Sequence, residues 1–551
     1  MADSIPIPVP TPESSMAVTV CIVAMLAVST LIGFYFFRRS KTYDEWMIGH
    51  RDMGPIVTGL ALTASWLSGW AIFGNAGLSY TYGWSGSWLI GTMNLMGLSL
   101  CVVMGYRMRR YTGLGARTVP EVARIRFDSR LVQALAGGAM IILLIVYSVG
   151  QYKAMASVWT LTTGTGWLGS LVLTAILCAV YIVVGGYAGT QVSLALQGGI
   201  FMVIGWIFGI ASIYWAGGPA KIAEVIAAAD YVGKGGAATT IPIGGYTTAL
   251  GPSYAGYDWL GVIAAMFMFL LMATGFPQNI ARFLGTRKVT KKEYSILMLL
   301  VALNCVTPLM VGAMGLAARA VWGADLMTIA PIFGDAAASL VSMAMGGPVG
   351  AAIFSMAVFS AAVSTIAGMV MIMATNISRD FVYNLMPKTP PRVLLLLARI
   401  FVIPLIIIPL WWTYTSPPPV LSEFMSGSAV AQAGIFFFVI AVSMYWKRAT
   451  KWGAVAAIVY GMAAALLHPN VWGSALPPFN HWGVWALTVM GGCALVYVVV
   501  SLLTKPLPNE KLAVFFPQKK QAPAQPSQTE APVEAQAQAQ VQMPAPGQPT
   551  Q

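Results

Sequence analysis

Long apolar runs, separated by short polar or basic connections, make up most of this chain. A helix needs roughly 20 apolar residues to cross a bilayer, and the pattern predicts thirteen such helices. Their approximate ranges are 16–37, 54–77, 84–106, 132–160, 166–186, 190–215, 258–279, 295–320, 347–375, 393–413, 424–445, 452–468 and 482–503. We therefore predict an all-α polytopic membrane protein.

The composition supports this class. Of the 551 residues, 58% are hydrophobic and 9% are charged, whereas soluble domains carry roughly 25% charged residues. The five cysteines all fall inside apolar spans, without pairing or metal-ligand spacing. We interpret them as free thiols packed between helices.

The net charge of +13 is a topology signal, because the basic residues gather in alternate connections. Thirteen spans with the N-terminus outside place every basic cluster on one face, which the positive-inside rule makes cytoplasmic. Residues 1–15 are then an extracytoplasmic N-terminus, and 216–257 form an outer loop. Residues 505–551 are rich in Pro, Gln and Ala, and predict a disordered cytoplasmic tail. The charge gives no reason to expect a nucleic-acid partner.

The second span contains a stretch that is a poor helix former, Leu62-Thr-Ala-Ser-Trp-Leu-Ser-Gly-Trp-Ala71. Gly and Ser lower helix propensity, and short polar side chains compete for backbone hydrogen bonds. Backbone can leave a helix at membrane depth only where it is buried in protein or lines a cavity. The stretch predicts either a break at a binding site or a small-residue face for helix packing.

A second polar segment lies in the ninth span, at 360–368. Ala361, Ser364 and Thr365 are spaced i, i+3 and i+4, so they share one helix face. Hydroxyl and carbonyl oxygens are hard ligands of the kind that Na⁺ prefers. The alternative is that both hydroxyls bond back to their own helix.

Acidic residues are absent from the middle of every span; Asp335, for example, falls in a predicted outer connection. Proton-driven carriers usually need a titratable group at depth, so proton coupling is disfavoured. The chain also lacks a nucleophile–base pair, a metal-ligand cluster and a Walker loop. We therefore predict neither an enzyme nor an ATP-driven pump.

Lys153 lies well inside the fourth span, where a lysine costs roughly 2.5–3.5 kcal/mol by insertion scales. No span offers it an acidic partner. Two explanations stay open: the side chain snorkels to the outer headgroups, or it is a counter-charge for an anionic substrate.

Five groups of residues resemble the sodium/solute symporter family, and within it most closely the sodium/pantothenate symporter branch. They are 49–57 with 62–64, the aromatic-x-aromatic-Gly at 80–83, Phe276-Pro-Gln278 with Arg282, 361–365 with 377–380, and Tyr445-Trp-Lys-Arg-Ala449 with Gly453, Ala454 and Gly461. The last is the most specific, although Tyr460 departs from its usual small or aliphatic residue. The resemblance covers about residues 20–505.

This resemblance implies a leucine-transporter-type five-plus-five inverted repeat. The repeats would be 54–215 and 258–446, with 16–53 and 447–504 as added segments. Their first helices would be the broken ones, at Ser65–Gly69 and Thr274–Pro277. Paired breaks of this kind are expected of inverted repeats.

The resemblance also implies a sodium site. The sodium ligands would be the backbone carbonyls of Ala64, Leu67 and Ala361, and the hydroxyls of Ser364 and Thr365. We further predict, beyond the resemblance, that substrate binds near Trp66, Ser68, Gln151, Lys153, Thr274 and Gln278. Trp66 stands where the proline branch of the family has an Asp, which argues against a proline-like mode of substrate binding.

Together these observations predict a monomeric sodium-coupled symporter of the cell (cytoplasmic) membrane. It would import a small organic solute, a carboxylate such as pantothenate or a related monocarboxylate. Na⁺ would be the co-transported ion, and the lipid bilayer the other partner. A proton-coupled importer, and a transporter-like sensor or channel, remain as alternatives.

Overall fold

A computed structural model describes residues 5–39, 45, 52–228, 245–250, 258–418, 421–468, 478–479 and 481–516. The chain divides into two units, Met1–Pro506 and Leu507–Gln551. The first unit holds all of the predicted spans. In the second, the described residues include one short helix, α21 (Asn509–Ala513), and the rest of the predicted tail, 517–551, lies outside the described residues.

The described part of the first unit is helical, with no strand. Its α-helices are α1 (Pro12–Arg39), α3 (Pro55–Trp66), α4 (Asn75–Tyr82), α5 (Trp84–Gly105), α6 (Met108–Gly113), α7 (Val119–Phe127), α8 (Arg130–Thr163), α9 (Trp167–Trp215), α10 (Pro219–Ala227), α11 (Trp259–Gly275), α12 (Pro277–Ile280), α13 (Lys291–Cys305), α14 (Thr307–Trp322), α15 (Ala337–Thr375), α16 (Pro391–Thr415), α17 (Leu421–Phe436), α18 (Lys451–Ala465) and α20 (Trp482–Leu503). Short 3₁₀ and π segments join them: η1 (Trp70–Gly74), η3 (Gly245–Thr247), η5 (Ala281–Phe283), η6 (Asp325–Thr328), η7 (Phe333–Ala336), η8 (Asn376–Tyr383), η9 (Phe437–Ala441) and η10 (Val442–Met444).

The apolar helices coincide with the predicted spans. Among the described residues, nine helices are long and apolar enough to cross a membrane, or eleven if each of two bent pairs is one span. Trp167–Ala179 and Lys451–Ala465 are shorter apolar helices that fall on the remaining two predictions. The spans predicted at 166–186 and 190–215 are not separated by a loop, because helical backbone continues through both as α9. No proline lies between them to remove a helical donor.

Both predicted helix breaks are present. The helix pair Pro55–Trp66 and Trp70–Tyr82 bends by 61°, and the pair Trp259–Gly275 and Pro277–Phe283 bends by 44°. At the second break, Pro277 disfavours helical geometry in the preceding residue, and Phe276 is extended (φ −73°, ψ 117°). The breaks therefore follow from local sequence, Ser68-Gly69 in one repeat and Pro277 in the other.

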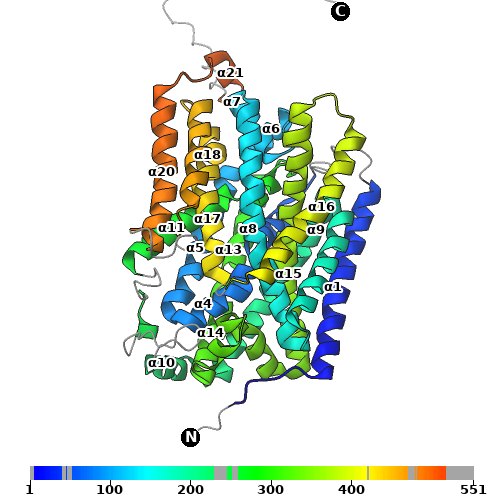
Figure 1. Cartoon of the computed structure of the whole chain (residues 1–551), viewed down its shortest axis with the longest axis vertical. Helices are drawn as coiled ribbons and strands as arrows, with labels where there is room; N and C mark the ends of the chain where they lie inside the picture. The colour runs from blue at the N-terminus through cyan, green and yellow to red at the C-terminus, as the bar shows by residue number, and fades with distance from the viewer. Residues whose placement is uncertain are drawn as a thin grey trace, which may run out of the picture. The chain divides into compact units, whose positions relative to one another are not determined.

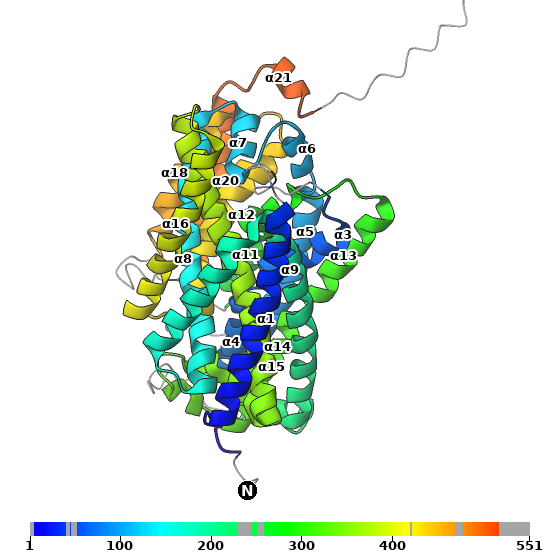
Figure 2. The same cartoon turned by 90° about the vertical axis from the view of Figure 1, so that its right-hand side faces the viewer.

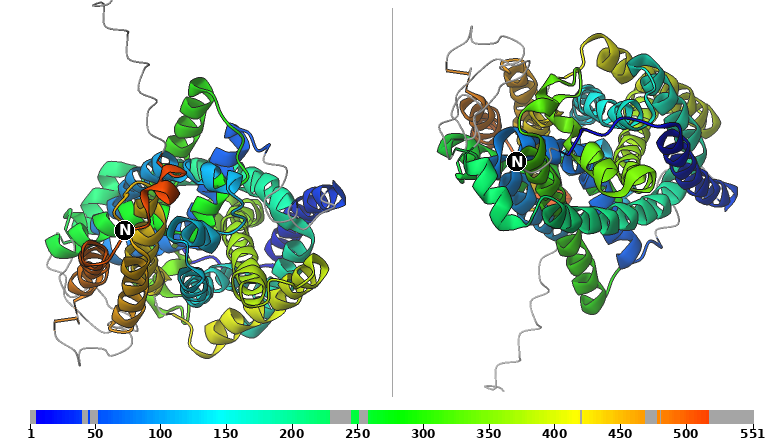
Figure 3. Two further views of the ribbon diagram at one scale, coloured as in Figure 1. Left: turned by 90° about the horizontal axis from the view of Figure 1, so that it is seen from above. Right: turned by 90° about the horizontal axis from the view of Figure 1, so that it is seen from below.

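The helix α15 forms the centre of the bundle. It packs against α1, α8 and α9, and almost every residue between Gly350 and Ala374 is buried. Peripheral helices such as α16 and α20 instead expose many apolar side chains, as expected for surfaces that face lipid. Figures 2 and 3 show α15, in yellow-green, enclosed by the other helices.

Within the first unit, α1 starts at one end of the bundle, and α20 finishes at the opposite end, where α6 and α7 also lie (Figure 1). An odd number of crossings requires this arrangement. We call the end that carries α6, α7 and their arginines the basic end. The helix α10 lies at the other end.

Close packing between the helices depends on glycine at several contacts, and Gly315 provides a test. A Cβ at Gly315 of α14 would overlap the Ala76 carbonyl oxygen of α4, whereas a Cβ at Gly491 of α20 would meet nothing within 4 Å. Gly315→Ala should lower the stability of the purified protein by about 1–3 kcal/mol, because the two backbones must separate. Gly491→Ala, the matched control, should leave the melting temperature in detergent unchanged or slightly raised. Equal effects of the two changes would contradict the packing.

Candidate functional site

The break between α3 and η1 is stabilised by side chains from other helices. Its Gly69 N–H donates to the Gln151 side-chain oxygen of α8 at 2.9 Å. A Cβ at Gly69 would lie 2.8 Å from the Ala154 Cβ, so this approach of α8 requires glycine. Backbone freed from a helix at membrane depth is thereby satisfied within the protein.

Four of the five predicted sodium ligands meet between this break and α15. The Ser364 hydroxyl oxygen lies 2.9 Å from the Ala64 carbonyl oxygen and 2.9 Å from the Ala361 carbonyl oxygen. The Thr365 hydroxyl donates to the same Ala361 carbonyl at 3.0 Å. We call these four groups the oxygen cluster; all four residues are fully buried.

Leu67, the fifth predicted ligand, is the first residue after α3 and has left helical geometry (φ −79°, ψ 83°). The last carbonyls of a helix lack intrahelical partners, so this segment offers further oxygens. The predicted alternative, bonding of the two hydroxyls to their own helix, is also present. Ser364 differs because its hydroxyl also reaches Ala64, on a helix distant in sequence. A hydroxyl can rotate to turn its lone pairs toward a cation, so the residues fit a sodium ion.

The predicted substrate residue Trp66 forms part of an aromatic wall. Its ring centroid lies 5.6 Å from that of Phe276, the extended residue of the second break, and Tyr147 of α8 lies 5.2 Å from Phe276. The Trp66 indole N–H donates to the Asn94 side-chain oxygen of α5 at 2.6 Å. The two breaks therefore touch through aromatic side chains.

Ser68 and Gln151 approach the same wall. The Ser68 hydroxyl lies 3.3 Å from the Tyr147 hydroxyl, and Tyr147 precedes Gln151 by one helical turn on α8. The structure thus brings Trp66, Ser68 and Gln151 together around one break.

Thr274 and Gln278 flank Phe276 on either side of the second break, and both are fully buried. Among the residues that the structure describes, neither the amide oxygen nor the amide nitrogen of Gln278 has a hydrogen-bond partner. An unsatisfied buried polar group costs about 1–3 kcal/mol. Such an amide, next to a helix break, is what a polar ligand contact requires.

The sequence indicated that Lys153 has no acidic partner, and this expectation is wrong. Its ammonium lies 2.6 Å from a carboxylate oxygen of Asp335, with both side chains buried. Asp335 was predicted in an outer connection, but η7 directs it inward, where it also accepts the Leu421 N–H of α17 at 3.1 Å. A Cβ at Gly77 of α4 would overlap the Asp335 side chain. The pair thus joins α8, α4 and α17, and it accounts for Lys153 without snorkelling; a role in substrate binding stays a hypothesis.

Several residues of this region were missed at the level of sequence. They are Asn94, Tyr147, Phe269, Asn304 and Asp335. Two of them could have been found from the sequence. Asn94 is a polar residue in the middle of an apolar span, and Tyr147 lies four residues before Gln151, on the same helix face. Nothing in the sequence indicated that Asp335 belongs to this region, because hydropathy does not show which way a connection folds.

A second polar network ties the exit of α15 to the basic end. Arg379 of η8 pairs with Glu121 of α7 at 2.7 Å. The neighbouring Asp380 accepts hydrogen bonds from the Thr118 hydroxyl at 2.8 Å and the Gln133 amide at 2.7 Å. This network fixes η8 against α7 and the first turn of α8.

The paired discontinuous helices, with buried polar groups between them and the central α15, define a secondary transporter rather than an enzyme. The sodium:solute symporter family matches residues 46–461. The chain belongs to this family.

Two known proteins are similar to this chain over most of its length. It is 23% identical over 506 residues to a sodium/proline symporter of Staphylococcus aureus strain JH9, covering 88% of this chain and 93% of that protein. The fold resembles the substrate-bound, outward-open structure of a Na⁺-coupled sialic acid symporter, with a TM-score of 0.66, 20% identity and coverage of 89% and 98%. The fold is therefore the leucine-transporter type that was predicted, in a multi-pass membrane protein.

The ion pair of Lys153 generates a prediction. Lys153→Gln leaves a buried carboxylate without its main partner and should destabilise the protein by about 3–5 kcal/mol. Adding Asp335→Asn removes that charge and should restore at least half of the loss in melting temperature. The control is Lys221→Gln, which removes an exposed pair with Glu224 and should change nothing measurable. Unchanged stability of Lys153→Gln, with selective loss of carboxylate uptake, would favour the counter-charge role instead.

Proposed function

We propose that this protein couples the entry of Na⁺ to the import of a small organic carboxylate across the cell membrane, and does so as a monomer. Pantothenate or a related monocarboxylate is the class of solute we expect. The observation that carries the proposal is the oxygen cluster. In this cluster the Ser364 hydroxyl of α15 lies 2.9 Å from the Ala64 carbonyl oxygen, which belongs to the last turn of α3, the first half of a broken helix.

Coupling follows from the position of this cluster. A sodium ion held by the carbonyls of Ala64 and Ala361 and the hydroxyls of Ser364 and Thr365, with Leu67 at the break, would tie α3 to α15. An ion that prefers one arrangement of these two helices shifts the population toward it, by no more than its difference in affinity. Substrate bound at the adjacent breaks would then meet the arrangement that Na⁺ favours.

The substrate region combines an aromatic wall with a few polar groups, as small-molecule sites generally do. Trp66 would contact the apolar part of the solute. The candidate polar contacts are Ser68, Gln151, Thr274 and Gln278, and the unsatisfied amide of Gln278 is the strongest of them. Lys153 would contribute only if substrate competes with Asp335 for its ammonium.

Two arguments support a carboxylate other than proline. The relatives named above transport proline and sialic acid, and both molecules carry a carboxylate. Trp66, which replaces an acidic residue of the proline branch, fills the space beside the break with a ring that contacts Phe276. The assignment to a pantothenate-like branch remains part of this proposal.

Proton-coupled import is the second candidate, because the carboxyl groups of Asp335 and Asp380, although outside the middle of the spans, are buried. Replacing Na⁺ with choline at fixed pH separates the two candidates. Uptake that persists in choline and follows an imposed pH gradient would favour the proton.

The sodium site generates a prediction. Ser364→Ala and Thr365→Ala each remove an oxygen ligand while retaining a good helix former. Each should raise the Na⁺ concentration for half-maximal uptake about tenfold, equivalent to roughly 1.4 kcal/mol. Ser342→Ala is the matched control, since this buried α15 hydroxyl lies outside the oxygen cluster and donates to the Ser339 carbonyl of its own turn. If both variants keep the sodium dependence of the control, the site is wrong.

Orientation provides a further prediction. Lys451 at the start of α18 and Lys221 of α10 are both exposed. A cysteine at position 451 should react with a membrane-impermeant reagent only from the cytoplasm, and a cysteine at 221 only from outside. Labelling is measured in intact cells and after permeabilisation. The reverse pattern would invert the proposed topology.

A further inference from the structure

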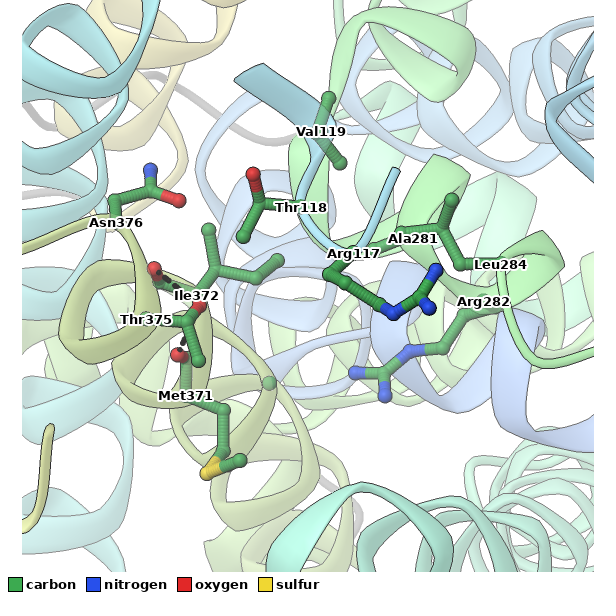
Figure 4. A pocket seen from close by; sticks show the side chains of 11 residues that line it. Arg117, Thr118, Val119, Ala281, Arg282, Leu284, Met371, Ile372, Thr375 and Asn376 are labelled. Atoms are coloured by element: carbon green, nitrogen blue, oxygen red, sulfur yellow. Dashed lines mark hydrogen bonds between the residues drawn. The ribbon is translucent and has the colours of Figure 1, made fainter. Parts of the chain in front are cut away.

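A cavity at the basic end lies between three segments that are distant in sequence. Its lining comprises Arg117, Thr118 and Val119 before and within α7, Ala281, Arg282 and Leu284 around η5, and Gly368, Met371, Ile372, Thr375 and Asn376 of α15 and η8. Figure 4 shows these side chains around the open space. Among the described residues, this lining contains two arginines and no carboxylate.

Arg282 is a buried cation that the fold holds in place. Its side chain is 4% exposed, and its Nε donates to the Ser65 hydroxyl of α3 at 2.9 Å. Another guanidinium nitrogen donates to the Gln191 oxygen of α9 at 3.3 Å. A Cβ at Gly368 of α15 would overlap the Arg282 guanidinium, so this approach depends on glycine. Three helices thus fix one charged group at the cavity wall.

Arg117 supplies the second cation. Its Nη1 donates to the Ala116 carbonyl at 3.3 Å and the Thr112 carbonyl at 3.4 Å. These bonds keep its charge close to the connection before α7. Figure 4 shows the Arg117 and Arg282 guanidinium groups on the same wall, with Ile372 projecting toward Arg117 from the other side.

Two carboxylates close to Arg117 have hydrogen-bond partners outside the lining. Glu121 pairs with Arg379 and accepts the backbone N–H of Arg117, and Asp380 accepts from Thr118 and Gln133. Two guanidinium groups in a confined, partly desolvated space produce a positive potential that favours an anion. Arginine also matches the planar, two-oxygen geometry of a carboxylate.

We propose that this cavity is an anion-binding site for small carboxylates, separate from the region between the helix breaks. Arg282 follows Gln278 by four residues along the same half-helix, and it touches Ser65, next to Ala64 of the oxygen cluster. The cavity at the basic end therefore borders the proposed substrate region through Arg282. Its occupant is either the transported solute on its way to the cytoplasm, which rests on the proposed function, or another cytoplasmic carboxylate.

The first test measures the charge preference of the cavity. Ile372→Cys, in the full-length protein in detergent, is modified with a sulfonate-bearing and a trimethylammonium-bearing methanethiosulfonate. Each rate of modification is divided by the rate at which the same reagent reacts with 2-mercaptoethanol in solution. The normalised rate should be about tenfold higher for the anionic reagent than for the cationic one. Adding Arg117→Gln should reduce this preference at least threefold, and Arg117→Lys should largely restore it. Arg110→Gln removes an exposed charge of α6 that does not line the cavity and should leave the ratio unchanged. The protein without the Ile372→Cys change is treated in the same way, to measure any background reaction of Cys21, the half-buried native thiol.

The second test identifies the occupant. Propionate should slow the modification of Ile372→Cys, and propionamide at the same sodium concentration should not. Protection by a solute that the protein transports would place the site on the transport route. Protection by propionate alone would assign it to another cytoplasmic carboxylate.

The proposal is overturned if the reagents react with equal relative rates, if Arg117→Gln leaves the ratio unchanged, if neither reagent reacts, or if propionamide protects as well as propionate. None of these measurements depends on sodium-driven uptake. Failure here is therefore distinguishable from failure of the proposed symport.

Discussion

The requirement that no backbone group at membrane depth be left unsatisfied controls this structure. Between Trp66 and Trp70 the chain leaves the helix, and helix–helix contacts replace the hydrogen bonds that it gives up. Gln151 of α8 accepts the freed Gly69 N–H, and Ser364 of α15 reaches the carbonyl of Ala64. The central helix and α8 are thus held to the break by the groups that the break exposes. The break is therefore a structural joint between α3, α8 and α15.

Buried charged side chains at both ends of the bundle also bond to partners within the protein. Lys153 and Asp335 are buried as a pair at 2.6 Å, and Arg379 with Glu121 joins η8 to α7. Arg126 instead donates to backbone carbonyls, including that of Ser443 at 2.6 Å. Each arrangement links segments that are distant in the sequence. An ion pair that is costly to break on one side alone is suited to hold such segments in one of two arrangements.

The chemistry of the centre is sparse. One aromatic wall, a few hydroxyls and amides, and the oxygen cluster lie among buried side chains that are mostly apolar. Few polar groups suffice because each is worth more where water is excluded. An anion-attracting cavity at the basic end extends this chemistry beyond the breaks, since Arg282 belongs to the same half-helix as Gln278.

The sequence by itself determined the class and the spans, because the hydropathy pattern acts locally. Helix-disfavouring residues, Ser68-Gly69 and Pro277, marked the two places where the helices break, and the spacing of Ala361, Ser364 and Thr365 fixes one helix face. Only the tertiary structure decided which groups meet across long sequence separations. Asp335 was predicted in an outer connection, and Lys153 appeared unpartnered; their contact depends on how η7 folds against α4, α8 and α17. Arg117 and Arg282 likewise share a cavity only because α7, η5 and α15 converge. Such contacts arise from packing between distant segments, and no local property of the chain encodes them.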